Sequence, residues 1–266
     1  MSPGLLVTSS FLPGRGGIET YLAKLCDLLA PSLTVLAPPR RDGEPLLQDL
    51  DYPTFPFSRR IPLPDRRALE EIVETARQLG TDRVLFGTPW PLILLGPGLK
   101  RRGLRYASIV HGAELVAPSA VPILRTRLRR SLSEADLLLP VSDYTRRRTE
   151  RFLRSSGRPV PPMELLRARI DLDRYRCEDD RSSLRAQIGL PSDGKMVLCF
   201  GRLVPRKGTH RVIEAMRLVR DRVPGATLVI AGTGPEMRRL KRLASADNDL
   251  VVFTGRVPDE DAAKVY

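Results

Sequence analysis

The feature that most constrains the fold of this 266-residue chain is a regular alternation of short apolar runs and longer amphipathic stretches. Several runs are apolar at consecutive positions, as expected of parallel strands covered on both faces. After the first run, apolar side chains recur with the spacing of a helix face, at Ile18, Tyr21, Leu22, Leu25 and Leu29. This alternation predicts an α/β fold with a mainly parallel sheet. We expect strands at residues 5–8, 33–37, 84–86, 106–110, 137–141, 196–200, 227–231 and 250–253.

The chain is long enough for two modest domains, and a stretch rich in charge and turn residues separates two parts of it. We expect an N-terminal domain over residues 1–170, a linker over 171–194 and a C-terminal domain over 195–266. The last part holds about three strand–helix units, fewer than a domain of ~100–150 residues would. We therefore expect the second domain to be incomplete.

Composition excludes several classes of protein. Hydrophobic residues make up 42% of the chain, enough for a buried core, which argues against global disorder. No apolar run reaches the ~18 residues of a membrane span, and the N-terminus lacks the pattern of a secretory signal. The three cysteines fit neither a disulfide framework nor a zinc site. We expect a reducing, cytoplasmic location.

The chain is strongly basic, with 44 lysines and arginines against 31 acidic residues and a net charge of +13. A GC-rich genome produces an arginine excess, and so does selection for an anionic partner. Arginine clusters at 125–130 and 146–148 lie in expected amphipathic helices. Such helices are either solvated or lie on an anionic membrane, so peripheral binding to the inner face of the cell membrane stays open. Aromatic residues are only 5%, so we expect no nucleic-acid partner.

The sharpest local signal is a basic loop that directly follows the strand expected at 196–200. Arg202 and Lys207 lie in this loop, and a helix is expected to begin after Gly208 and Thr209. Ligands of parallel α/β sheets bind at the carboxyl ends of the strands. A guanidinium, an ammonium and the N–H groups of a helix start together fit a diphosphate. A solvated basic loop explains the same residues, and on the residues alone both readings stay open.

Two glycine-rich turns follow other expected strands. Gly232 and Gly234 come directly after the strand at 227–231, where they allow the close approach of a ligand or of another backbone segment. Gly16 and Gly17 end a loop after the first strand that lacks the G-x-G-x-x-G pattern of dinucleotide-binding proteins. Backbone amides in such a loop can meet an anion. A plain strand–helix connection is the alternative.

His111 follows the strand expected at 106–110 and is one of only two histidines. At a strand end it can hydrogen-bond a sugar hydroxyl or an oxygen that gains charge, and a structural role is the alternative. We expect the second histidine, His210, to pack at the start of a helix.

Three pairs of aspartates have the D-x-D spacing that can hold Mg²⁺. None clearly follows an expected strand end in a glycine-rich turn, so surface turns explain them better, and we expect no metal. The pairs are Asp49/Asp51, Asp171/Asp173 and Asp247/Asp249.

Together these segments resemble glycosyltransferase family 4, retaining enzymes of the GT-B fold that use nucleotide sugars. The most specific motif is G-R-L-x-x-x-K-G at 201–208. The phrases at 202–208 and 141–148 are most similar to phosphatidylinositol mannosyltransferases. The resemblance implies two Rossmann-like domains, the N-terminal one on the acceptor side and the C-terminal one binding the nucleotide sugar.

The resemblance also implies roles for individual residues. By motif position, Arg202 and Lys207 would neutralise the leaving diphosphate in place of a metal, so no cofactor is expected. Gly16 and Gly17 would approach the diphosphate, and His111 would contact the transferred sugar. The sugar would move with retention, with the leaving phosphate taking the acceptor proton. Glu114, Gly232 and Gly234 complete the set of residues expected to bind substrate.

The activity implied is transfer of a hexose, with mannose from GDP-mannose moving to a lipid or polyol such as a phosphatidylinositol mannoside. Two alternatives stay open: a transferase that uses a UDP-sugar and a soluble acceptor, and a non-catalytic remnant or anion-binding module. The second arises because the sequence ends before the Glu-x7-Glu element of the family. In addition, Arg169 stands where the family has a Gly-Val-Asp turn, and keeping that turn would require a positive φ there.

Overall fold

The computed structural model describes residues 3–14, 16–39, 50–115, 121–170, 172–173, 175, 185–186, 194–245, 250–258 and 261–265. Contacts divide the chain into two compact units, Met1–Arg169 and Ile170–Tyr266. Each unit is built on its own parallel sheet, so the expected α/β fold is confirmed. The described D-x-D members are Asp51 and Asp173, and their partners and the third pair lie outside the described residues.

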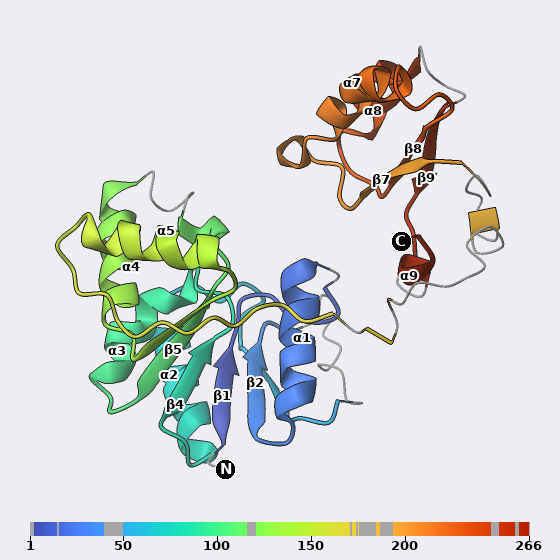
Figure 1. Ribbon diagram of the computed structural model, residues 1–266. Coiled ribbons are helices and arrows are strands. Elements are labelled where there is room, and N and C mark those ends of the chain that lie inside the picture. Colours follow the sequence, from blue (N-terminus) through green and yellow to red (C-terminus); the bar gives the residue numbers. More distant parts are fainter. Residues whose placement is uncertain are drawn as a thin grey trace. The chain divides into compact units, whose positions relative to one another are not determined.

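The first unit contains a six-stranded parallel sheet in the order β3-β2-β1-β4-β5-β6 (Figure 1). Chain order reverses between β1 and β4, and in doubly wound sheets this switch point is where ligands bind, outside the carboxyl ends of the strands. The strands are β1 (Gly4–Val7), β2 (Leu33–Ala37), β3 (Thr54–Pro56), β4 (Arg83–Phe86), β5 (Arg105–Val110) and β6 (Leu137–Pro140). β3 is not among the strands expected from sequence.

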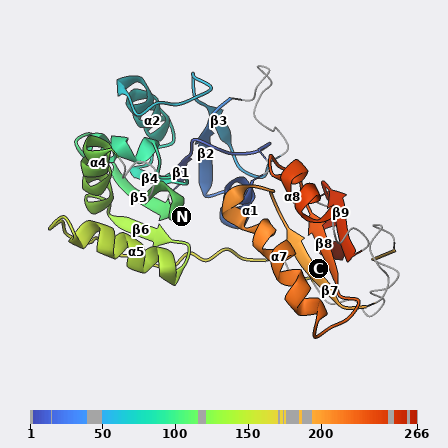
Figure 2. The same ribbon diagram turned by 90° about the horizontal axis from the view of Figure 1, so that it is seen from above.

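Alternate residues of the strands enter cores on opposite faces of this sheet. Leu5 and Val7 pack into one core, and Leu6 packs into the other. The first core takes residues from the helices that follow β3, and the second takes Leu22 and Cys26 of the first helix. Figure 2 shows α1 on one side of the sheet, with α2 and α4 on the other. The helices are α1 (Gly17–Leu29), α2 (Arg66–Gln78), α3 (Gly96–Lys100), α4 (Pro122–Ser133) and α5 (Asp143–Arg154), with 3-10 turns η1 (Leu92–Leu95) and η2 (Ala113–Leu115).

After α5 the chain passes beside the edge strand β6 as an extended segment. The Glu164 N–H donates to the Leu138 carbonyl, and the Leu166 N–H donates to the Pro140 carbonyl at 3.0 Å. The segment continues past α1 to Arg169. Among the described residues only glycines have a positive φ, so Arg169 does not form the left-handed turn considered from the sequence.

The second unit contains a three-stranded parallel sheet in the order β7-β8-β9. Its core includes Leu203, Ile213 and Leu228, all nearly inaccessible to solvent. No residue of this core belongs to the first unit. The elements are β7 (Met196–Phe200), η4 (Pro205–Lys207), α7 (Thr209–Arg220), β8 (Thr227–Ala231), α8 (Met237–Leu243), β9 (Val251–Gly255) and α9 (Ala262–Val265).

Candidate functional site

Three hydroxyl groups meet at the switch point of the first sheet. Thr8 follows β1 and Thr88 follows β4, and their Oγ1 atoms lie 3.1 Å apart. The Ser9 hydroxyl lies 3.0 Å from the Thr88 Oγ1, which also accepts from the Ser9 N–H. Thr8 is inaccessible to solvent and Thr88 is nearly so. Their contact therefore holds the ends of β1 and β4 in one geometry. Sequence reasoning did not single out this cluster, although each member comes directly or nearly directly after an apolar strand.

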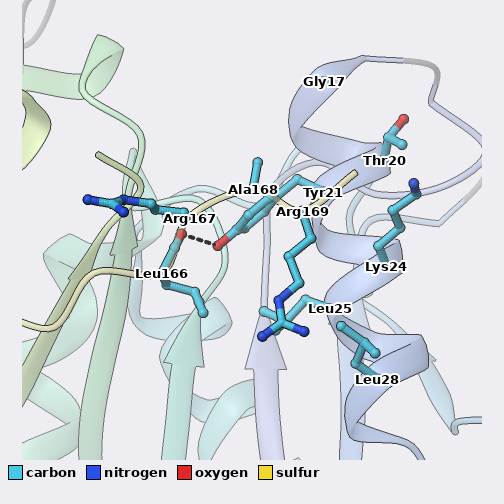
Figure 3. A pocket seen from close by; sticks show the side chains of 10 residues that line it. All are labelled: Gly17, Thr20, Tyr21, Lys24, Leu25, Leu28, Leu166, Arg167, Ala168 and Arg169. Carbon is cyan, nitrogen blue, oxygen red and sulfur yellow. Dashed lines mark hydrogen bonds between the residues drawn. The ribbon is translucent and has the colours of Figure 1, made fainter. Parts of the chain in front are cut away.

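His111 stands beside this cluster at the end of β5. Its Nε2 lies 2.9 Å from the Gly87 carbonyl oxygen, which accepts only if Nε2 carries the proton. The Tyr21 ring of α1 meets the imidazole edge to face, with centroids 5.6 Å apart. The Tyr21 hydroxyl donates to the Leu166 carbonyl at 2.9 Å, and burial raises its pKa to about 12 (Figure 3). His111 is therefore held from two sides, and its Nδ1 takes part in neither contact.

Glu114 lies one turn after His111 and fixes its backbone. The Glu114 Oε1 accepts the His111 N–H at 2.7 Å, and the side chain is buried. Between them Gly112 has a φ of +100°, a conformation that side chains other than glycine rarely adopt. This contact gives Glu114 a structural role. Its expected part in binding substrate stays a prediction.

The glycine-rich loop before α1 is shaped by Glu19 in the first turn of that helix. The Ser10 hydroxyl donates to the Glu19 carboxylate, which lies directly under the loop. A methyl group on Gly16 would collide with a Glu19 carboxylate oxygen, whereas one on Gly17 would meet nothing within 4 Å. A side chain on Gly16 would therefore require the flexible Glu19 carboxylate to move, whereas one on Gly17 would require no movement. Glu19 is a further residue to which sequence reasoning did not assign a role.

In the second unit, the basic loop follows β7 as the sequence predicts. Arg202 and Lys207 both line a cavity of about 100 Å³, together with Gly201 and Thr209. Both cations are exposed, and neither forms an ion pair with a carboxylate in the described part of the chain. Gly208 takes a left-handed conformation (φ 70°) and caps α7. The loop therefore presents two uncompensated cations beside the start of a helix, an arrangement that suits a multiply charged anion.

The glycine turn after β8 packs against this basic loop. The Leu203 N–H donates to the Thr233 carbonyl at 2.9 Å, and the Glu236 N–H donates to the Leu203 carbonyl at 3.1 Å. Methyl groups on Gly232 and Gly234 would collide with the carbonyl oxygens of Gly201 and Leu203, respectively. Of the two alternatives left open by the sequence, the approach of another backbone segment accounts for both glycines. Their expected role in substrate binding is not needed to explain them.

The remaining features considered from the sequence are the second histidine, a metal site and a membrane span. His210 lies at the second position of α7, at the helix start, as expected. Among the described residues there is no group of three or more histidine, cysteine, aspartate or glutamate side chains placed to hold a metal ion. None of the helices in the described ranges combines the length and apolar character that a bilayer crossing requires.

Comparison with protein families and curated proteins assigns both halves of the chain. A model described as Glycosyltransferase Family 4 matches residues 15–161, and one described as glycosyl transferases group 1 matches residues 180–266. The GDP-mannose-dependent alpha-(1-6)-phosphatidylinositol monomannoside mannosyltransferase of Mycolicibacterium smegmatis is 36% identical, covering 97% of this chain and 68% of that protein. The protein of the same name from Mycobacterium tuberculosis is 34% identical, covering 98% and 69%.

Comparison with solved structures identifies the fold. HepE from Anabaena, crystallised with UDP, matches with a TM-score of 0.77 at 18% identity, over 98% of this chain and 71% of that one. Sucrose-phosphate synthase from Thermosynechococcus elongatus matches with a TM-score of 0.74 at 18% identity, over 98% and 72%. These identities are low, so the structures inform the fold alone, which is GT-B. On the family models and the identity to its relatives, the chain belongs to glycosyltransferase family 4 and is a hexosyltransferase.

Proposed function

We propose that this chain transfers mannose from GDP-mannose to a phosphatidylinositol-type glycolipid, with retention at the sugar carbon. The observation that carries the proposal is that Arg202 and Lys207 line one small cavity beyond β7 and form no ion pair with a carboxylate among the described residues. The identity of sugar and acceptor is supported by the activity for which the two mycobacterial relatives are named, and these relatives are 34–36% identical over nearly the whole chain.

The donor's diphosphate is the natural occupant of the basic loop. The planar Arg202 guanidinium can bind phosphate oxygens in a bidentate manner, and Lys207 adds a point charge. Hydrogen bonds to the β8 turn fix the backbone of the loop, so both cations extend from a fixed backbone toward the leaving group as it becomes more negative. No metal or other cofactor enters this proposal.

In the transfer step, the bond from the anomeric carbon to the diphosphate oxygen breaks and a bond to the acceptor oxygen forms on the same face. The proton of the acceptor hydroxyl goes to the leaving phosphate, so that GDP is released. We assign His111 to the sugar, where Nδ1 can accept a hydrogen bond while Nε2 is committed to Gly87. The roles of Gly16 and Gly17 toward the donor stay predictions from the resemblance.

The acceptor is proposed to reach the first unit from a membrane surface. The exposed side chains of Ile123 in α4 and Tyr144 in α5 accompany the arginine clusters of those helices. Apolar groups among cations are suited to the interface of an anionic bilayer. We therefore place the enzyme in the cytoplasm, bound peripherally to the inner face of the cell membrane.

Calorimetric titration of the 266-residue chain with GDP-mannose, GDP and UDP-glucose tests the donor assignment. We expect GDP-mannose to bind more tightly than UDP-glucose. We expect Arg202→Ala/Lys207→Ala to weaken that binding at least about tenfold, because two charge-assisted contacts are lost. Arg206→Ala is the matched control, because this exposed cation of the same loop does not line the cavity. The control should change the affinity by less than about twofold, and EDTA should leave it unchanged.

Three results would contradict the proposal. Preference for UDP-glucose would favour a UDP-sugar transferase. Equal weakening by Arg206→Ala and by the double variant would mean that the loop acts only through its net charge. No binding of any nucleotide to the folded chain would favour a non-catalytic remnant.

A further inference from the structure

A groove lies on the first unit between α1 and the extended segment at residues 166–169 (Figure 3). Its volume is about 290 Å³. This is close to the lower end of ligand pockets, which span roughly 300–1,000 Å³. One wall is a single face of α1, and Tyr21, Leu25 and Leu28 supply its apolar part. Leu166 contributes the apolar side chain of the opposite wall.

The groove is apolar but open to solvent. Leu28 is 65% exposed, although it lies on the same helix face as the half-buried Leu25. Single exposed leucines are common on protein surfaces. Here, however, the exposed leucine continues a hollowed apolar strip that begins at Tyr21, so it is part of the groove and not an isolated exposed side chain.

Cations border this apolar strip. Lys24 and Arg169 line the groove, and neither forms an ion pair with a carboxylate among the described residues, whereas Arg167 pairs with Asp143 at 2.7 Å. Figure 3 draws the Lys24 ammonium toward Thr20, at the N-terminal end of the groove, and the Arg169 side chain toward Leu25. The groove therefore has a positive charge, that of Lys24, at the end nearest the start of α1, and an apolar middle. The second cation, Arg169, has a methylene stem that can cover an apolar ligand.

We propose that this groove holds one acyl chain of an anionic phospholipid, with the phosphate at Lys24 and the chain running past Leu25 to Leu28. The inference rests on the proposed function in taking that lipid as the acceptor. Tyr21 makes the connection, because its ring forms a wall of the groove and also meets His111. A chain in the groove thus brings its headgroup toward the strand ends where His111 lies.

The test measures binding of dioctanoyl phosphatidylinositol to the full chain without donor, below the micelle concentration, with glycerophosphoinositol as the chain-free probe. We expect Leu28→Gln to weaken dioctanoyl lipid binding about fivefold, because the acyl chain loses apolar contact. Leu29→Gln is the matched control: this leucine is the next residue of α1, is 41% exposed and does not line the groove. It should leave binding unchanged.

The cation is tested separately. Lys24→Gln should weaken lipid binding about fivefold at low salt, and this difference should shrink at high salt while the Leu28→Gln difference persists. Arg101→Gln, an exposed cation on the turn after α3, is the control and should have no effect. Ala168→Trp, which fills the groove from the opposite wall, should also weaken binding and provides a second variant if Leu28→Gln fails to fold.

Several outcomes would overturn the inference without touching the donor assignment, because the donor titration uses no lipid. Equal effects of Leu28→Gln and Leu29→Gln would exclude the groove. Equal affinity for glycerophosphoinositol and the dioctanoyl lipid would mean an anion site with no acyl-chain contact. Self-association of the wild type that Leu28→Gln abolishes in sedimentation would make the groove an interface between copies. Failure of GDP-mannose binding, with lipid binding intact, would instead count against the proposed function.

Discussion

At the scale of single residues, the glycines of the two loops differ in what a methyl group would meet. We predict that Gly234→Ala destabilises the second unit by about 1–3 kcal/mol, because the added carbon would collide with the Leu203 carbonyl. Gly17→Ala should leave the free energy of unfolding unchanged or raise it by up to about 1 kcal/mol. Alanine favours a helix more than glycine does, and no atom lies within 4 Å of the added methyl group. Urea unfolding of both variants measures the difference.

The same pair also separates packing from ligand contact. If a phosphate closely approaches the backbone at Gly17, Gly17→Ala should lower GDP-mannose affinity while the protein remains stable. Unchanged affinity would show that Gly17 is not needed for donor binding. A stable Gly234→Ala variant would contradict the packing argument for that turn.

The residues that sequence reasoning missed share one property. Each acts through a partner that no local pattern identifies. Glu19 lies under the glycine-rich loop, Tyr21 contacts an imidazole 90 positions away, and Thr88 contacts a threonine 80 positions away. By contrast, Arg202 and Lys207 lie in one loop directly after an apolar strand, so local reasoning sufficed to predict that they lie close together, and their role in binding stays a prediction. A site assembled from several strand ends is only partly visible in the linear sequence.

At the scale of elements, α2 begins at a charged cap. The Asp65 carboxylate accepts the Ala68 N–H at 3.0 Å, and that bond, with the nearby Arg59, lowers the pKa of Asp65 below its ordinary value. A lowered folded-state pKa contributes stability above the unfolded-state pKa, and this is lost as the pH falls through the folded value. We predict that Asp65→Asn lowers the urea midpoint near pH 7 and that the gap to wild type closes on acidification below the usual carboxyl range. A gap independent of pH would contradict this origin.

Among the strands, the expected ones were apolar runs, and those runs do form β1, β2 and β4–β9. β3 was not predicted because Thr54–Pro56 is short and ends in proline. It also lies at the edge of the sheet, where a strand can pair without being an apolar run. Helix faces were readable from apolar spacing, as in α1. The groove beside α1 was not, because it depends on where the segment at 166–169 runs after leaving the sheet.

At the scale of the whole molecule, the buried apolar side chains of the described residues form cores whose members each belong to a single unit. Leu128 lies in the first unit and Leu228 in the second, and both are fully buried. We predict that replacing either one by alanine lowers the free energy of unfolding of its own unit by about 2–5 kcal/mol and leaves the transition of the other unit unchanged. Differential scanning calorimetry of the two variants beside wild type measures this. A single transition shifted equally by both would show that the units unfold together.

The meeting of Thr8 and Thr88 has a consequence for synthesis of the chain. β1 can pair with β2 soon after both leave the ribosome, but its other neighbour, β4, ends only at Phe86. At ~5–20 residues per second, several seconds separate the two pairings. During that interval one edge of β1 has no partner, and such an edge invites association with other chains. The hydroxyl cluster can therefore close only after Thr88 has been synthesised, and this contact across 80 residues is one of the long-range contacts that slow folding of the first unit.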